Sequence, residues 1–135
     1  MTSAATPTVP AHNRWVLQAL STVTGRRILP NLCGLRFAGR GTGRTVVLPV
    51  AHAACGTDVM VLVGHATDKR WWRNFHDGHP AELLLDGRWR TARGEVVGPD
   101  RIEYPRLLAG YRAAHPHTSA RTTDPIVHFV VTDRP

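Results

Sequence analysis

The sequence from Ala81 to Val97 is Ala-Glu-Leu-Leu-Leu-Asp-Gly-Arg-Trp-Arg-Thr-Ala-Arg-Gly-Glu-Val-Val. Its centre, Asp86-Gly87, is a two-residue signal for a tight turn between antiparallel strands. In the second half, Trp89, Thr91, Arg93 and Glu95 alternate with Arg90, Ala92, Gly94 and Val96. This period of two is typical of a β-strand. The stretch therefore predicts a β-hairpin with strands over 81–85 and 88–97.

Further strands are predicted on both sides of this hairpin. They cover residues 32–38, 45–51, 58–63 and 125–132, and two of them, 45–51 and 58–63, are rich in β-branched side chains. Helices are predicted from Asn13 to Gly25, from Asp68 to Phe75, and over 104–114 with Pro105 in the first turn. Six strands joined mainly by hairpins predict a mainly β (α+β) fold, a small closed or nearly closed antiparallel barrel.

Length and composition predict one domain. The chain has 135 residues, 42% hydrophobic and 20% charged, which suits a single core over residues 13–135 after a flexible leader, residues 1–12. No apolar run is long enough for a membrane span, and the first ten residues do not resemble a signal peptide, so we expect a cytoplasmic protein without stable membrane insertion. Cys33 and Cys55 are expected to be free thiols, and no zinc-like spacing predicts a metal site.

The formal net charge is +7, and its distribution is uneven. No acidic residue precedes Asp58, whereas six arginines do. Such a region attracts phosphate or another anion, although a bias toward arginine in the coding genome explains the composition equally well. The basic residues come without interleaved exposed aromatics on one strand face, so nucleic acid is not an expected partner.

The first candidate site is the glycine-rich turn over residues 39–45, Gly-Arg-Gly-Thr-Gly-Arg-Thr. Its glycines allow close approach of the backbone to a ligand, and Arg40 and Arg44 add positive charge, so the turn is a candidate anion site. It lacks the Lys-Ser/Thr ending of a P-loop and the strand–turn–helix context of a dinucleotide fingerprint. An ordinary flexible hairpin remains the alternative.

Two further segments carry candidate site residues. In residues 64–75, Trp71 and Trp72 face different directions, so that one packs inward while the other walls a pocket, and Asn74 shares the face of Trp71. The loop His115-Pro116-His117 follows Tyr111 by one helical turn, and a histidine or tyrosine there could supply a proton. The alternatives are core aromatics and solvent-exposed loop histidines.

Taken together, these segments resemble the deazaflavin-dependent nitroreductase-like proteins of actinobacteria, within the split β-barrel group that includes pyridoxamine phosphate oxidase-like flavoproteins. The resemblance covers roughly residues 13–133. It rests on four ordered stretches: Gly39–Arg44 leading to Leu48-Pro49-Val50, Trp71–Phe75, Tyr104–Leu108, and Arg121–Val127. It implies a split barrel with an N-terminal helix, to which the sequence pattern adds the two short connecting helices predicted above. Because related barrels are often dimers, it also implies a homodimer.

The resemblance further implies the deazaflavin coenzyme F420, a hydride carrier, and an oxidoreductase acting on a small conjugated or aromatic molecule. By position, the cofactor-binding residues would be Arg40, Gly41, Thr42, Gly43, Arg44, Leu48, Pro49, Val50, Val63, Gly64, His65, Trp71 and Asn74. The catalytic, substrate-side residues would be Tyr111, His115 and His117. Substrate identity and the direction of electron transfer are not implied.

This chain also departs from the family's pattern. Family members usually carry a further basic residue where this chain has Gly41, and commonly another where it has Val46. The loop after the third predicted strand is usually longer, with lysine and paired glycines, whereas here it is His65-Ala66-Thr67-Asp68-Lys69. Two alternatives therefore stand beside F420: a flavoprotein that binds flavin mononucleotide (FMN), and a non-redox barrel that binds or rearranges a small ligand.

Overall fold

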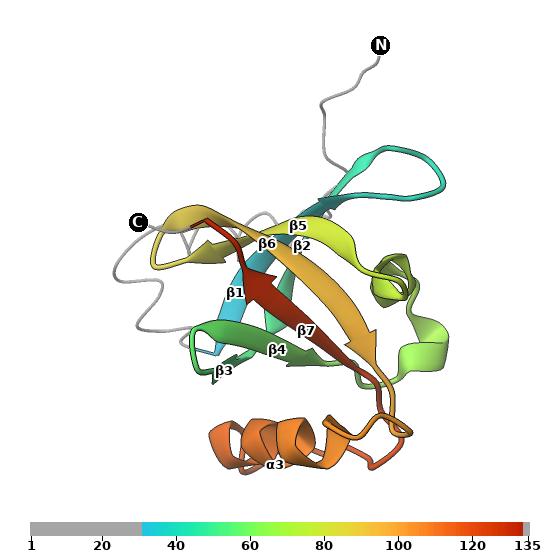
Figure 1. Cartoon of the computed structure of the whole chain (residues 1–135), viewed down its shortest axis with the longest axis vertical. Helices are drawn as coiled ribbons and strands as arrows, with labels where there is room; N and C mark the ends of the chain where they lie inside the picture. Colours follow the sequence, from blue (N-terminus) through green and yellow to red (C-terminus); the bar gives the residue numbers. More distant parts are fainter. Residues whose placement is uncertain (1–30, 134–135) are drawn as a thin grey trace. The chain divides into compact units, whose positions relative to one another are not determined.

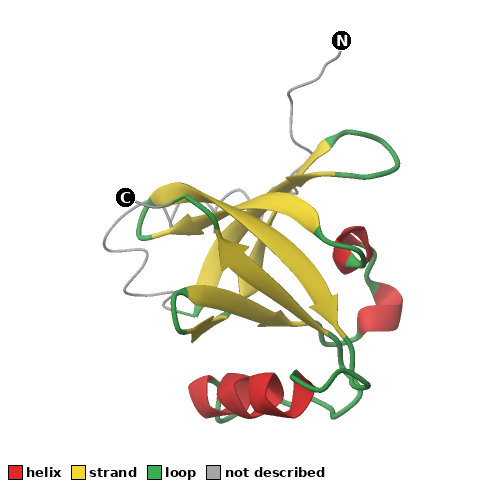
Figure 2. Ribbon diagram, in the orientation of Figure 1, coloured by secondary structure: helices red, strands yellow, loops and turns green. Residues whose placement is uncertain are grey.

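The computed structural model describes residues 31–133. The predicted leader and the helix predicted from Asn13 to Gly25 lie outside the described residues. Over the described part the chain is mainly β, as the strands in Figures 1 and 2 show. The elements are β1 (Leu32–Ala38), β2 (Thr45–Ala51), β3 (Ala53–Cys55), β4 (Asp58–Leu62), the 3-10 turns η1 (Ala66–Asp68) and η2 (Trp71–Phe75), β5 (His79–Leu85), β6 (Arg88–Val97), α3 (Tyr104–Ala114) and β7 (Ile126–Val131).

One compact unit contains the described residues 31–51, 80–92 and 132–133. Its strand order is β2-β1-β5-β6. Strand β1 pairs antiparallel with β2 and β5, so that Leu35 lies opposite both Leu48 and Leu83. Leu35 and Leu83 are fully buried. Cys33, Leu35 and Phe37 point to one face of β1 and are buried, which gives this unit its apolar face; Gly34 between them is buried as well.

The predicted β5–β6 hairpin is confirmed, with strands His79–Leu85 and Arg88–Val97. Asp86 has φ 52° and Gly87 has φ 76°. Two successive positive φ values are what a type I′ turn requires, and Asp-Gly is a preferred pair for it. The predicted alternation also holds, because Ala92, Gly94 and Val96 are buried and the residues between them are exposed.

The other unit contains residues 52–79 and 93–131. Its strand order is β6-β7-β4-β3, and α3 packs against β3, β4 and β7. The α3 helix begins as predicted, with Pro105 in its first turn. The core under it is formed by Ala53, Met60, Val97, Tyr104, Leu107, Leu108, Tyr111 and Ile126.

A glycine in the middle of β6 has a packing reason. A Cβ atom added at Gly94 would lie 2.6 Å from Cε1 of Phe129 and 2.7 Å from Cδ1 of Phe75. These two rings are fully buried and meet edge to face, with centroids 5.2 Å apart. Gly94 therefore allows the backbone of β6 to lie directly against the aromatic pair.

The predicted strands are confirmed with small shifts at their ends, and two expectations need correction. The described residues hold seven strands, because Ala53–Cys55 forms a short hairpin with β4 around Gly56. Three residues are too few to show a period. The helix predicted over 68–75 is instead two 3-10 turns, separated at Lys69, whose backbone is extended. Asp68 closes the first turn rather than capping a helix.

Among the described residues, no helix combines the length and apolar character that a bilayer crossing needs. Cys33 and Cys55 are free thiols, as expected. Burial raises the pKa of the Cys33 thiol to about 12, so this cysteine stays protonated and acts as a small core residue.

Candidate functional site

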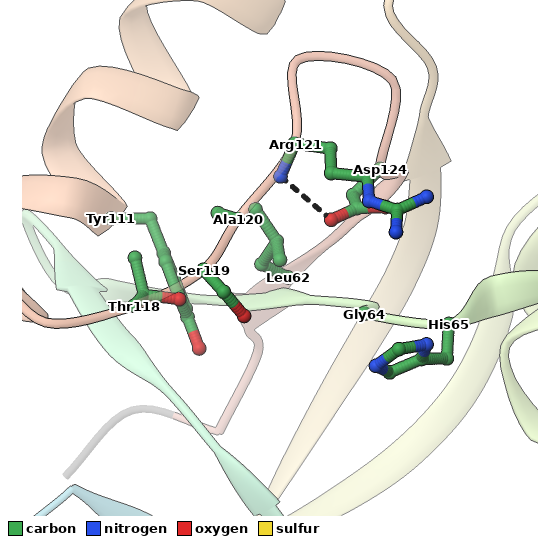
Figure 3. Close-up of a pocket in the computed structure, with 9 residues that line it drawn as sticks. All are labelled: Leu62, Gly64, His65, Tyr111, Thr118, Ser119, Ala120, Arg121 and Asp124. Carbon is green, nitrogen blue, oxygen red and sulfur yellow. Dashed lines mark hydrogen bonds between the residues drawn. The ribbon is translucent and has the colours of Figure 1, made fainter.

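A pocket of about 230 Å³ opens in the unit formed by residues 52–79 and 93–131. Its walls come from the end of β4 and the turn after it, from the last turn of α3, and from the loop that precedes β7 (Figure 3). The lining residues are Leu62, Gly64, His65, Tyr111, Thr118, Ser119, Ala120, Arg121 and Asp124. Six of these nine residues have polar side chains, which can donate or accept hydrogen bonds.

The loop before β7 is held in place by hydrogen bonds at both of its ends. The Tyr104 phenol donates to the carbonyl oxygen of Asp124, at 2.5 Å, and Arg112 donates to the carbonyl oxygen of Ala120, at 2.9 Å. Within the loop, the backbone N–H of Arg121 donates to Oδ2 of Asp124 at 2.9 Å, the dashed line in Figure 3. The N–H of Asp124 donates back to the carbonyl oxygen of Arg121. The wall of the pocket is therefore fixed by α3 and by its own turn.

Tyr111 joins the pocket to the core of this unit. Its ring is buried and stacks on the His115 ring, with centroids 4.4 Å apart. Nε2 of His115 lies 2.7 Å from the carbonyl oxygen of His52. Because a carbonyl oxygen only accepts, the hydrogen bond requires a proton on this nitrogen. Burial raises the pKa of Tyr111 above its ordinary value of 10.0, so the phenol is neutral at pH 7 and can donate a hydrogen bond.

His65 lies on the opposite segment, after β4. Its backbone is in the left-handed region, at φ 54° and ψ 45°, where a residue with a Cβ atom is strained. Its side chain is exposed and its ring turns toward the pocket in Figure 3. A strained non-glycine residue at a pocket is a reason to suspect a functional role.

The structure places the other residues predicted for the substrate side and the facing loop as follows. Gly64 lines the pocket, and Val63 is buried, with its N–H donated to the carbonyl oxygen of Pro125. His115 supports Tyr111 without lining the pocket, and His117 is exposed on the loop. Their predicted catalytic roles stay predictions.

The tryptophan pair differs from the expectation that one ring is a core anchor. Trp71 and Trp72 are both half-buried, and the fully buried ring of this segment is Phe75. Nε1 of Trp72 donates to the carbonyl oxygens of Ala66 and Lys69, which ties the two 3-10 turns together. Nδ2 of Asn74 donates to the carbonyl oxygen of Trp71. Trp71 and Asn74 do not line the pocket described above.

The glycine-rich turn joins β1 to β2 in the other unit. Three of its N–H groups donate within the turn: Gly39 to the carbonyl oxygen of Arg44, Gly43 to that of Gly39, and Arg44 to Oγ1 of Thr42. These N–H groups form hydrogen bonds within the turn and are therefore not available to bind a ligand. The side chains of Arg40 and Arg44 are exposed, and so are Gly41, Thr42 and Gly43. The turn therefore fits an anionic group through its guanidinium groups more than through its backbone.

The remaining predicted cofactor-binding residues lie on β2. Val50 is buried, and Leu48 and Pro49 are half-buried. Gly41 has no positive φ, and a Cβ atom added there would have no heavy atom within 4 Å. A larger residue fits at that position, whereas Gly43, with φ +70°, favours glycine.

Sequence reasoning missed four polar residues of the pocket: Thr118, Ser119, Arg121 and Asp124. They belong to a loop that the sequence does predict, and Arg121 and Asp124 fall in one of the stretches that carry the family resemblance. No spacing rule assigns them a role, because a loop has no period. The sequence signal that could have identified these residues is the high density of hydroxyl and charged side chains directly before a buried strand.

Comparison with known proteins gives a fold. No protein-family model matches the chain, and no curated protein sequence matches it. One similar solved structure is HutZ, the heme storage protein from Vibrio cholerae, with a TM-score of 0.52 and 11% sequence identity over 80% of this chain and 86% of that chain. A second is described as a domain-swapped dimer, with a TM-score of 0.51 and 17% identity over 88% of this chain and 93% of that chain. A third is a heme binding protein from Mycobacterium smegmatis, with a TM-score of 0.51 and 15% identity over 92% of this chain and 52% of that chain. This chain thus spans about half the length of the last of these. At such low identity the likeness shows the fold alone. The described residues have the split β-barrel fold that the resemblance implies, with seven strands and one α-helix.

Proposed function

We propose that this protein is an oxidoreductase that transfers a hydride between the deazaflavin coenzyme F420 and a small conjugated or aromatic substrate held in the pocket. The observation that carries the proposal is the pocket itself, in which a neutral, buried phenol stands among other hydrogen-bonding side chains. Its volume, about 230 Å³, is below the 300–1,000 Å³ of pockets for drug-sized ligands. It suits a small substrate better than a whole cofactor.

In this proposal the residues of the chain position the substrate and move a proton. Tyr111 donates a hydrogen bond to the substrate, and its stacking on His115 keeps the ring oriented. Thr118 and Ser119 add hydroxyl groups on the same loop. The bound coenzyme supplies the hydride chemistry.

The β1–β2 turn is the proposed contact for the anionic tail of the coenzyme. Arg40 and Arg44 are exposed there, and charge-assisted contacts of this kind contribute about 1.5–3 kcal/mol each when well formed. Arg40→Ala should weaken cofactor binding with little change in melting temperature. Unchanged affinity would remove this assignment.

A gain-of-affinity variant tests the same turn more sharply. Gly41→Lys restores the basic residue usual in the family at a position where a side chain meets no obstacle. It should tighten F420 binding by about tenfold. The control is Ala54→Lys, which adds the same charge at an exposed position of β3. Equal effects of the two variants would indicate a general charge effect and no specific tail site.

The first experiment is a fluorescence titration of the purified chain with F420, with FMN in parallel and heme followed by absorbance. Heme is included because two of the similar structures are those of a heme storage protein and a heme binding protein. Saturable binding of F420 at micromolar or lower concentration supports the proposal. Preferential binding of FMN or heme replaces the cofactor, and no binding of any leaves a non-redox barrel for a small ligand.

The proposal includes a homodimer, and one of the similar structures, a domain-swapped dimer, supports it. Light scattering coupled to size-exclusion chromatography measures the mass directly. A monomeric mass at assay concentrations would remove this part of the proposal.

A further inference from the structure

The pocket is rich in side-chain donors that have no partner among the described residues. The guanidinium of Arg121, the hydroxyls of Thr118 and Ser119, and the imidazole of His65 make no hydrogen bond or ion pair with another residue in 31–133. All four line the same 230 Å³ pocket. In Figure 3 the hydroxyl groups of Thr118 and Ser119 lie on the Tyr111 side of Asp124, and the Arg121 guanidinium lies on its other side.

The carboxylate of Asp124, the acidic residue of the pocket, already accepts a hydrogen bond from the loop. Asp124 is 9% exposed, and its Oδ2 accepts the backbone N–H of Arg121. Its own N–H and carbonyl are used by Arg121 and Tyr104. No ion pair joins the Asp124 carboxylate to the Arg121 guanidinium within the described residues. The carboxylate therefore serves the turn, while the cationic group keeps its donors for a ligand.

We infer that the pocket selects a small substrate that carries a carboxylate bound by Arg121, while Ser119 and Thr118 donate hydrogen bonds to polar groups elsewhere on the molecule. A guanidinium matches a carboxylate with two parallel N–H donors, and the hydroxyl groups can hydrogen-bond a second polar group of the substrate. Leu62, Ala120 and the Tyr111 ring supply the less polar part of the lining, which suits a conjugated body attached to the carboxylate. This inference rests on the proposed function, since it names the substrate class of the same pocket.

Isothermal titration of the full chain with benzoate and with benzamide, without any cofactor, tests this inference. The two probes have nearly the same shape and differ in charge. Benzoate should bind about tenfold more tightly than benzamide, and its affinity should fall as salt increases. Arg121→Gln should abolish the preference, and Arg121→Lys should retain part of it, because a lysine keeps the charge but loses the paired donors.

The matched control is Arg70→Gln. Arg70 is an exposed arginine of the same unit that does not line the pocket, so its removal lowers the net charge equally. It should leave the benzoate preference unchanged. A melting curve for each variant shows that it is folded.

Two outcomes overturn the inference: equal affinities for benzoate and benzamide, including no binding of either, or an Arg121→Gln preference equal to that of the wild type. The experiments distinguish failure of this inference from failure of the proposed function. Benzoate selectivity without binding of F420 removes the cofactor and keeps the carboxylate site, whereas F420 binding without benzoate selectivity does the reverse.

Discussion

The phenol of Tyr104, at the start of α3, donates its hydrogen bond to the backbone carbonyl of Asp124, twenty residues later in the chain. Both residues are buried, and the bond ties the wall of the pocket to the helix. Because this carbonyl is shielded from water, losing its donor carries a desolvation cost as well as the loss of the bond itself.

Tyr104→Phe should therefore lower the free energy of unfolding by about 1–2 kcal/mol, measured by urea denaturation. The control is Thr132→Val, which removes an exposed hydroxyl–hydroxyl bond to Thr91. Its cost should be below about 0.5 kcal/mol. Equal losses in the two variants would contradict a special role for the buried bond.

Gly94→Ala should destabilise the protein by about 1–3 kcal/mol, because the new methyl group meets Phe75 and Phe129 at distances that real contacts do not reach. Thermal unfolding followed by circular dichroism measures the loss. Gly41→Ala is the matched control, since its added methyl group meets nothing within 4 Å. A Gly94→Ala protein as stable as the control would show that the rings move aside at no cost.

Gly87 and Gly94 show which features of the fold can be predicted from the sequence and which cannot. The hairpin around Asp86-Gly87 is predictable because a local rule of backbone conformation decides it. The role of Gly94 depends on two rings from segments that are distant in the sequence, and no local rule supplies that. The same holds for the site: Tyr111 and His65 could be named from the sequence, but the Arg121–Asp124 wall follows from a turn held by Tyr104.

Glu82 gives a prediction for pH. Its hydrogen bond from Nε of Arg36, 2.8 Å long, lowers the pKa of Glu82 below its ordinary value of 4.5. A depressed pKa in the folded state means stability that is present above 4.5 and lost as the pH falls through the lower, folded value. Wild type should therefore exceed Glu82→Gln in unfolding free energy at pH 7, by only about 0.5 kcal/mol because both side chains are about one third exposed.

This difference should shrink as the pH falls below 4.5, in denaturation curves recorded from pH 7 to pH 3. The control is Glu95→Gln, because Glu95 is more than half exposed and lies 3.8 Å from Arg101. Its effect on the unfolding free energy at pH 7 should be smaller than that of Glu82→Gln. A Glu82→Gln difference that grows on acidification would reverse the sign and contradict the assignment.

The left-handed backbone of His65 gives a prediction for stability. At φ 54° an alanine keeps the backbone strain and a glycine relieves it, so His65→Gly should be about 1 kcal/mol more stable than His65→Ala. Both variants lose the imidazole at the pocket and should bind benzoate equally. A His65→Gly protein no more stable than His65→Ala would show that the left-handed conformation is not maintained.

The hydrogen bond from Tyr104 has one more consequence, which concerns how this protein could change over evolution. The loop is held by the Tyr104 phenol and by backbone groups of Asp124 and Arg121. The proposed ligand contacts are different groups, namely the side chains of Thr118, Ser119 and Arg121. Substitutions of these three side chains should cost little stability, because Ser119 and Arg121 are exposed and Thr118 is only half-buried. If the pocket binds its substrate as proposed, single substitutions in this loop could change substrate preference while the protein stays folded.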